Sequence, residues 1–126
     1  MTHVAPGLND GPGMHPGHSD EVLAGMLGEI EAELLCVGHT HWPLQHQVGT
    51  ARLINDGSVS NPWSPDLRAS SGLIDADDPG YQVQFQRVEY DRAAAMEAVR
   101  RAHHPSGNFI VAGSGASSRN ASRATR

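Results

Sequence analysis

Hydrophobic and polar positions predict a loop at the start of the chain and a helix directly after it. Residues 3–18 contain four glycines and three prolines, so no regular element is expected there. Apolar side chains then recur every three or four positions from Val22 to Leu34, which is the spacing of one helix face. Ser19 is a suitable N-cap, because its hydroxyl accepts a hydrogen bond from the first turn. We therefore predict an amphipathic helix over 20–32.

A short apolar run follows this helix and predicts a buried strand. Residues 34–37 are Leu-Leu-Cys-Val, and Gly38 ends the run. Continuous apolar runs of this length are typical of strands that are covered on both faces. A helix, a buried strand and then a polar loop indicate an α/β arrangement, in which ligands bind beyond the carboxyl end of the strand. The loop after Gly38 is therefore a candidate site.

Alternating and turn-rich segments follow Pro43. They predict a β-hairpin made of 45–48 and 51–54 and a further strand over 70–74. Apolar and polar residues alternate over 81–90, which predicts a half-buried strand, and the alternation shifts by one position near Arg87. A helix is predicted from Asp91 to about His103. Residues 106–126 are mostly Gly, Ser, Ala, Asn and Arg and are predicted to form a disordered tail. Residues 1–105 are then one domain of mixed α/β (α+β) class.

Composition narrows the function classes. The chain has 126 residues, with 9 Lys+Arg against 14 Asp+Glu, and this acidic balance argues against general nucleic-acid binding. A single cysteine excludes an internal disulfide and a cysteine-only zinc site. No apolar run is long enough to span a membrane and the chain does not start with a signal-peptide pattern, so we expect a cytoplasmic protein. The unusual feature is the set of eight histidines.

The tetrapeptide Gly-His-Thr-His at 38–41 has the clearest chemistry. Two histidines one residue apart, in a loop after a strand, can converge on one metal or bridge two adjacent ones, and imidazole is a common neutral metal ligand. Gly38 lets the backbone approach such a site closely. Two further features belong to the same order of motifs: His3 stands before a Pro/Gly loop, and residues 55–58 form the turn Asn-Asp-Gly-Ser.

This order of motifs resembles the carboxyl-terminal half of the calcineurin-like metallophosphoesterases, in particular their small prokaryotic phosphodiesterase branch. The resemblance covers roughly residues 1–90 and implies a partial metallophosphoesterase β-sandwich with flanking helices. It also implies hydrolysis of phosphate esters through two divalent metal ions, which are manganese, iron, nickel or zinc. Carried over by position, it implies that His3 and His39 bind the second metal and that His41 binds the first.

Other features of that family differ or are missing here. Asn55 matches the start of the family turn that buttresses the site, but Asp56 replaces its usual proline, which should loosen the turn. The family's Asp-X-His, bridging Gly-Asp and Gly-Asn-His motifs have no counterpart in this sequence. We therefore expect a truncated or split member with no assigned catalytic residue and little activity alone. Two functions stay open: a phosphoesterase fragment, and a catalytically inactive metal-binding or regulatory remnant.

Several other side chains have a structural interpretation beside a functional one. His15 and His18 can reach a ligand phosphate or lie exposed in the loop, and Trp42 and Trp63 can stack on a nucleobase or aromatic ester or pack the loop edge. The remaining candidates are predicted to be structural: Cys36 in the core, His46 facing solvent or paired across strands, Asn9 and Asp10 in a turn, and His103 and His104 at a helix end.

The expected partners follow from the resemblance and from the incomplete sheet. The resemblance implies a phosphate-ester substrate. A half-sheet leaves an unpaired edge and an uncovered apolar face, which invite association. We therefore expect marginal stability, with a second copy of the chain or the missing amino-terminal half as the macromolecular partner.

Overall fold

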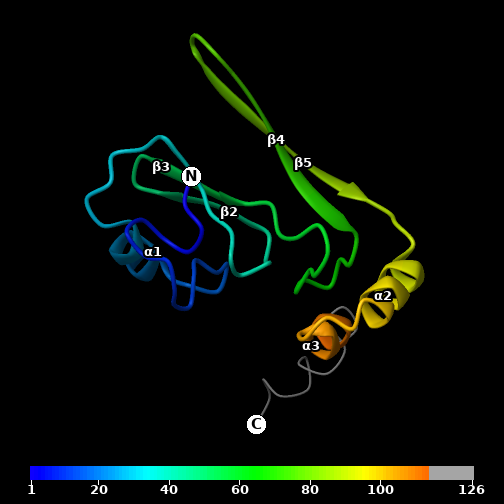
Figure 1. The fold of residues 1–126 in the computed structure, drawn as a ribbon. Helices are drawn as coiled ribbons and strands as arrows, with labels where there is room; N and C mark the ends of the chain where they lie inside the picture. The colour runs from blue at the N-terminus through cyan, green and yellow to red at the C-terminus, as the bar shows by residue number, and fades with distance from the viewer. Residues whose placement is uncertain (114–126) are drawn as a thin grey trace.

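The computed structural model describes residues 1–113, and their first half forms a small body of one helix and one sheet (Figure 1). We call residues 1–55 the body; it contains α1 (Asp20–Leu27), β1 (Leu34–Cys36), β2 (Leu44–Val48) and β3 (Ala51–Asn55). Residues 56–68 are the linking segment. Residues 69–113 are the carboxyl-terminal region, with β4 (Ala69–Asp77), β5 (Gly80–Val88), α2 (Arg92–Arg101) and α3 (Gly107–Gly113). This mixture of elements confirms the expected α+β class.

The sheet of the body has three strands in the order β1-β3-β2. β1 runs parallel to β3, while β2 and β3 form the predicted antiparallel hairpin. The start of the chain lies along β1: the Thr2 N–H donates to the Cys36 carbonyl at 3.0 Å, and the Gly38 N–H donates to the His3 carbonyl at 2.9 Å. These two backbone bonds fix His3 beside the end of β1, although His3 has no strand of its own.

The hydrophobic core of residues 1–113 lies within the body. Its cluster consists of Val4, Ala5, Met14, Leu23, Leu27, Leu35, Val37, Leu44, Ala51 and Leu53. Three of these residues come from the predicted loop at 3–18, so that loop is anchored to the body by apolar burial. Cys36 was predicted in the core but is only half-buried, because in the short strand β1 only Leu35 is fully buried. Burial still raises the pKa of the Cys36 thiol.

Helix α1 begins as predicted but is shorter. The Ser19 hydroxyl accepts a hydrogen bond from the Val22 N–H at 3.4 Å, as an N-cap does. The helix ends at Leu27 because Gly28 adopts a positive φ of 64°, the left-handed conformation that glycine favours at helix ends. Ile30, which extends the apolar pattern in the sequence, is 45% exposed. The predicted helix end at residue 32 was therefore wrong.

Strands β4 and β5 form a two-stranded ribbon that projects away from the body (Figure 1). β4 runs past the predicted end at Ile74, because the pairing with β5 continues in register to Asp77. Half-buried and exposed positions alternate through the whole of β5. Arg87 occupies a half-buried position and donates to the Ser70 hydroxyl at 2.6 Å. The predicted shift of the alternation near Arg87 was therefore wrong, because Arg87 occupies the half-buried position at which an apolar residue was expected.

Two helices follow the ribbon. Asp91 caps α2 as predicted, because its Oδ1 accepts a hydrogen bond from the Ala94 N–H at 2.9 Å. The helix ends at Arg101, ahead of the predicted end near His103, and His103 itself has a φ of 47°. α3 occupies residues that were predicted to be disordered, so that part of the tail prediction was wrong. The rest of the tail, 114–126, lies outside the described residues. Within residues 1–113, no helix has the length and apolar character to cross a membrane.

Candidate metal centre

The loop that leaves β1 holds both histidines of the tetrapeptide in strained backbone. His39 has a φ of 67° and His41 a φ of 56°, in the left-handed region that residues other than glycine rarely adopt. The Thr40 N–H donates to the Gly38 carbonyl at 2.8 Å and closes a γ-turn around His39. Such strain persists only where surrounding contacts maintain it, and it is concentrated at functional sites.

Asn55, at the end of β3, maintains this loop. It is 1% exposed, and its Nδ2 donates to the Gly38 carbonyl at 2.9 Å and to Thr40 Oγ1 at 3.1 Å. Its Oδ1 accepts from a backbone N–H of its own turn at 2.9 Å. The predicted buttressing by Asn55 is thus confirmed in geometry. Asp56 does more than replace a proline, because its Oδ2 accepts from the Gly72 N–H at 3.1 Å and ties the turn to β4.

His3 and His39 meet although they lie far apart in the sequence. His39 Nδ1 is 3.2 Å from His3 Nε2, and the two rings are nearly perpendicular. His39 Nε2 lies 2.8 Å from the Gly11 carbonyl oxygen. Because a carbonyl only accepts, His39 Nε2 carries the proton, and His39 Nδ1 accepts the hydrogen bond from His3 Nε2, whose proton a bound metal ion would replace. Metal-ligating histidines are commonly oriented in this way, by a carbonyl on the second ring nitrogen.

His41 is oriented by a different carbonyl. Its Nδ1 lies 2.9 Å from the backbone oxygen of Asn61, so Nδ1 carries the proton and Nε2 keeps its lone pair. The Trp63 N–H donates back to the His41 carbonyl at 3.4 Å. The linking segment and the tetrapeptide therefore hold each other. Sequence analysis missed Asn61 because a backbone carbonyl leaves no side-chain signal in a sequence.

The three histidines fit a divalent-metal site in part. Two nitrogens that share one metal at about 2.1 Å lie roughly 3.0–3.4 Å apart, between octahedral and tetrahedral angles, and the His3–His39 separation of 3.2 Å falls in this span. His41 does not complete a group with them: within residues 1–113, no three His, Cys, Asp or Glu side chains lie close enough to hold a metal. The arrangement offers one pair of ligands and one separate ligand.

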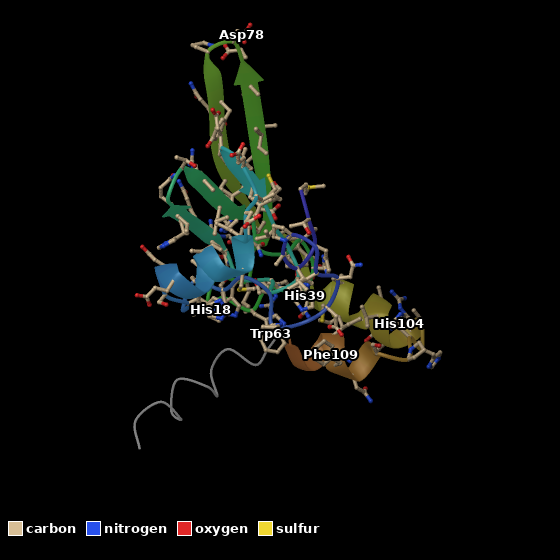
Figure 2. All side chains as sticks on the ribbon, turned by 90° about the vertical axis from the view of Figure 1, so that its left-hand side faces the viewer. His18, His39, Trp63, Asp78, His104 and Phe109 are labelled. Carbon is tan, nitrogen blue, oxygen red and sulfur yellow. The ribbon has the colours of Figure 1, made fainter. Side chains whose placement is uncertain are left out.

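A cleft of about 370 Å³ opens beside the histidines. It is lined by Pro12, His15, His39, Thr40, His41, Trp42, Asn61, Trp63 and Phe109. Figure 2 shows His39, Trp63 and Phe109 close to one another, with Asp78 far away at the tip of the ribbon. Phe109 was missed by sequence analysis because it falls in the segment predicted to be disordered.

His15 and His18 contribute to this region more than exposed loop residues would. Both are half-buried, and the His15 ring meets the Trp42 ring edge-on with centroids 5.1 Å apart. His15 Nδ1 accepts from the Gly17 N–H at 3.0 Å. Burial lowers the pKa of His15, and the nearby His18 lowers it further. The simpler interpretation of these two as exposed histidines was therefore wrong.

The remaining candidates make local contacts away from the cleft. His46 Nε2 lies 2.7 Å from Asp20 Oδ1, a contact between β2 and α1 that sequence analysis did not predict. Asp10 Oδ1 accepts from the next backbone N–H at 2.7 Å, in keeping with its predicted turn role. His104 Nδ1 accepts from the Ser106 N–H at 3.0 Å, which supports its structural role between α2 and α3.

Solved structures show which fold this is. The sequence matches no protein-family profile and no curated protein. The chain is similar to the crystal structure of a metallophosphoesterase from Sphaerobacter thermophilus, with a TM-score of 0.69 and 23% identity over 92% of this chain and 53% of that one. It is also similar to a hypothetical protein from Pyrococcus horikoshii OT3, with a TM-score of 0.69 and 20% identity over 87% of this chain and 42% of that one.

These likenesses define the class of fold. The chain has a fold found in a metallophosphoesterase and spans about half the length of the structures it matches. At this identity the likeness concerns the fold alone. The phosphodiesterase branch and the assignment to a carboxyl-terminal half stay predictions.

Proposed function

We propose that this chain supplies part of the dinuclear centre of a metal-dependent phosphoesterase that acts on phosphate esters. His3 and His39 would hold one divalent ion, and His41 the other. The proposal rests on one observation above all: His3 and His39 present nitrogens 3.2 Å apart, with the far nitrogen of His39 anchored on the Gly11 carbonyl. Divalent ions in such a centre supply Lewis-acid stabilisation of a phosphoryl group under attack.

The chain's own residues bind and orient in this proposal. The Gly11 and Asn61 carbonyls fix the ring positions of His39 and His41, so neither ring has to reorganise when it binds a metal. Asn55 fixes the loop between them. Burial lowers the pKa of His15, and in its neutral form the ring carries its proton on Nε2 because Nδ1 accepts from the backbone. An Nε2–H in the wall of the cleft is a suitable donor to a phosphoryl oxygen.

A second candidate is a metal-binding or regulatory domain without catalysis. It is favoured by the count of ligands: no group of three metal-binding side chains is assembled within residues 1–113. A working dinuclear centre needs further ligands, including a bridging carboxylate, to keep two like charges close together. The fold supports the first candidate, and the ligand count supports the second for the chain taken alone.

Metal binding tests the feature that both candidates share. We expect dialysed protein to retain manganese or zinc, measured by elemental analysis, and the double variant His39→Ala, His41→Ala to lose it. His46→Ala is the matched control, because His46 pairs with Asp20 outside the site. Equal metal content in the wild type and the double variant would contradict both candidates.

Hydrolysis separates the two candidates. With manganese and bis-p-nitrophenyl phosphate, we expect little turnover by the chain alone and a rise of several orders of magnitude when a metallophosphoesterase-type amino-terminal half is joined upstream, because residues that act as one unit fail together. His41→Ala should abolish the gain. Metal binding without any gain in hydrolysis would favour the regulatory candidate.

A further inference from the structure

The cleft is lined by two chemically different kinds of side chain. Its lining includes three imidazoles, those of His15, His39 and His41, and three larger aromatic rings, those of Trp42, Trp63 and Phe109. The protein has only two tryptophans, and both line this one cleft. Trp42 directly follows His41, and Trp63 is tied to the His41 carbonyl by its backbone N–H. Both tryptophans are therefore held to the loop that carries the histidines, and Phe109 joins them through its ring contact with Trp63.

Two of these rings are exposed where packing alone would bury them. Trp63 is 44% exposed and Phe109 60% exposed. Their ring centroids lie 6.3 Å apart at a tilt of 40°, so they contact each other without being covered. Trp42, by contrast, is half-buried and supported edge-on by His15. Exposed aromatic side chains gathered at one cleft indicate a binding surface.

Asn61, one of the residues that line the cleft, has an unsatisfied polar atom. Asn61 is 6% exposed, and its Oδ1 is buried with no hydrogen-bond partner in the described part of the chain. A buried acceptor without a partner is unfavourable, and such groups need an explanation such as a functional role or an unseen ligand or water. Because Oδ1 is shielded from solvent, it lies behind the surface of the cleft, and the Asn61 side chain would have to turn for this atom to meet an occupant.

We propose that this cleft binds the planar aromatic group of a phosphate ester, with the ring against Trp63 and Phe109 and the phosphate toward the histidines. The proposal rests on the proposed phosphoesterase function and names the class of substrate. A volume of about 370 Å³ lies at the small end of ligand pockets, which suits one ring and one phosphate. Imidazoles beside an aromatic wall match the two halves of an aryl phosphate.

Binding of matched ligands tests the proposal on the full chain. Phenyl phosphate and ethyl phosphate share the phosphate and differ in the ring; phenol has the ring alone. Trp42 and Trp63 make intrinsic fluorescence a direct reporter of the cleft. With manganese present, phenyl phosphate should bind at least about tenfold more tightly than ethyl phosphate, as expected from stacking on aromatic side chains. Equal dissociation constants for the two phosphates would overturn the proposal.

Variants locate the preference. In Trp63→Leu, Phe109→Leu the preference for phenyl phosphate should fall to about twofold or less, as expected when stacking is lost, with Trp42 still reporting. Phe85→Leu is the matched control, because Phe85 lines a different hollow beside Pro43 and Arg87. Circular dichroism confirms that each variant folds. A double variant that keeps the preference for phenyl phosphate would overturn the proposal. Tryptophan fluorescence that changes with protein concentration in the absence of ligand would also overturn it, because it would mean that a second copy occupies the cleft.

The same titrations separate this proposal from the proposed function. If phenol and phenyl phosphate bind equally well and both need Trp63, the aromatic site is supported while the phosphate-binding role of the histidines fails. If both phosphates bind equally well and both are lost in His39→Ala, the histidine site is supported and the aromatic proposal fails.

Discussion

The body and the carboxyl-terminal region bury their apolar side chains to very different extents. Every buried hydrophobic residue among residues 1–111 lies between positions 4 and 54. α2 buries none of its residues, and the ribbon leaves Leu73, Ile74 and Val88 between 42% and 55% exposed. The body therefore has a core of its own, whereas the carboxyl-terminal region extends away from it with most of its apolar side chains exposed.

The candidate site takes its residues from both the packed and the less packed parts of the molecule. His3, His39 and His41 are held by the packed body, where strained backbone can be maintained. Trp63 and Phe109, which also line the cleft, come from outside the body, on the linking segment and on α3, and both are exposed. The two-stranded ribbon has exposed apolar residues, and among residues 1–113 each of its strands has one edge without a partner strand.

The largest expected effect contrasts the two regions directly. Leu53 is fully buried and Leu73 is 55% exposed. Leu53→Ala should lower the free energy of unfolding by about 2–5 kcal/mol, because it leaves a cavity in the core. Leu73→Ala should change it by less than about 0.5 kcal/mol. Urea unfolding of the full chain measures both, and equal losses would contradict the division into a packed body and a surface region.

A somewhat smaller loss is expected at Asn55. Its amide makes three hydrogen bonds in a buried position, so Asn55→Ala should cost about 1–3 kcal/mol of unfolding free energy by leaving backbone groups without partners. It should also weaken metal binding, because Gly38 and Thr40 flank His39. Asn9→Ala, at an exposed position, is the control. Unchanged metal affinity in Asn55→Ala would show that the loop holds its shape without this residue.

Local patterns predicted the elements well and their ends poorly. Ser19 and Asp91 marked helix starts correctly, because N-caps act within one turn. The end of α1 was missed because Gly28 stops the helix while apolar residues continue in the sequence. α3 was missed because a short helix with Gly at both ends has little intrinsic helix propensity.

The candidate site was predictable only as far as its side chains are distinctive. The tetrapeptide placed His39 and His41 after a strand, and the resemblance added His3, which the structure brings to His39. The carbonyls of Gly11 and Asn61 were not predictable, because any residue supplies one. The aromatic cleft combines Trp42, Trp63 and Phe109 across 67 residues of sequence, and no local pattern reports such convergence.

Two glycines of the first loop test how closely the body is fitted around His39. Gly7 and Gly13 have similar φ values of 73° and 67°, but a Cβ at Gly13 would lie 2.9 Å from His39 Cδ2 and 2.8 Å from Thr40 Cγ2, while one at Gly7 meets nothing within 4 Å. Both alanine variants carry the same backbone strain of about 1–2 kcal/mol. Gly13→Ala should lose roughly 1 kcal/mol more from overpacking and shift the His39 ring resonances in NMR spectra. Equal behaviour of the two variants would mean that His39 moves freely aside.

The smallest expected effect lies in the linking segment, where Asp66 pairs with Arg68 and reaches Arg87 on the ribbon. Hydrogen bonds from Arg68 lower the pKa of Asp66 to about 2 from a usual value of 3.8, and the charge of Arg87 adds to the effect. Because the folded state holds the ionised carboxylate, the stabilisation is fully present above pH 3.8 and is lost as the pH falls toward 2. The side chains of Asp66 and Arg68 are 38% and 42% exposed, so solvent and salt keep the contribution small. The wild type should therefore lose its small advantage over Asp66→Asn across this pH window in urea unfolding. Arg68→Gln should show a weaker pH dependence of the unfolding free energy than the wild type, since it removes the main cause of the pKa shift. If Arg68→Gln keeps the full pH dependence of the wild type, the shift comes from Arg87 instead.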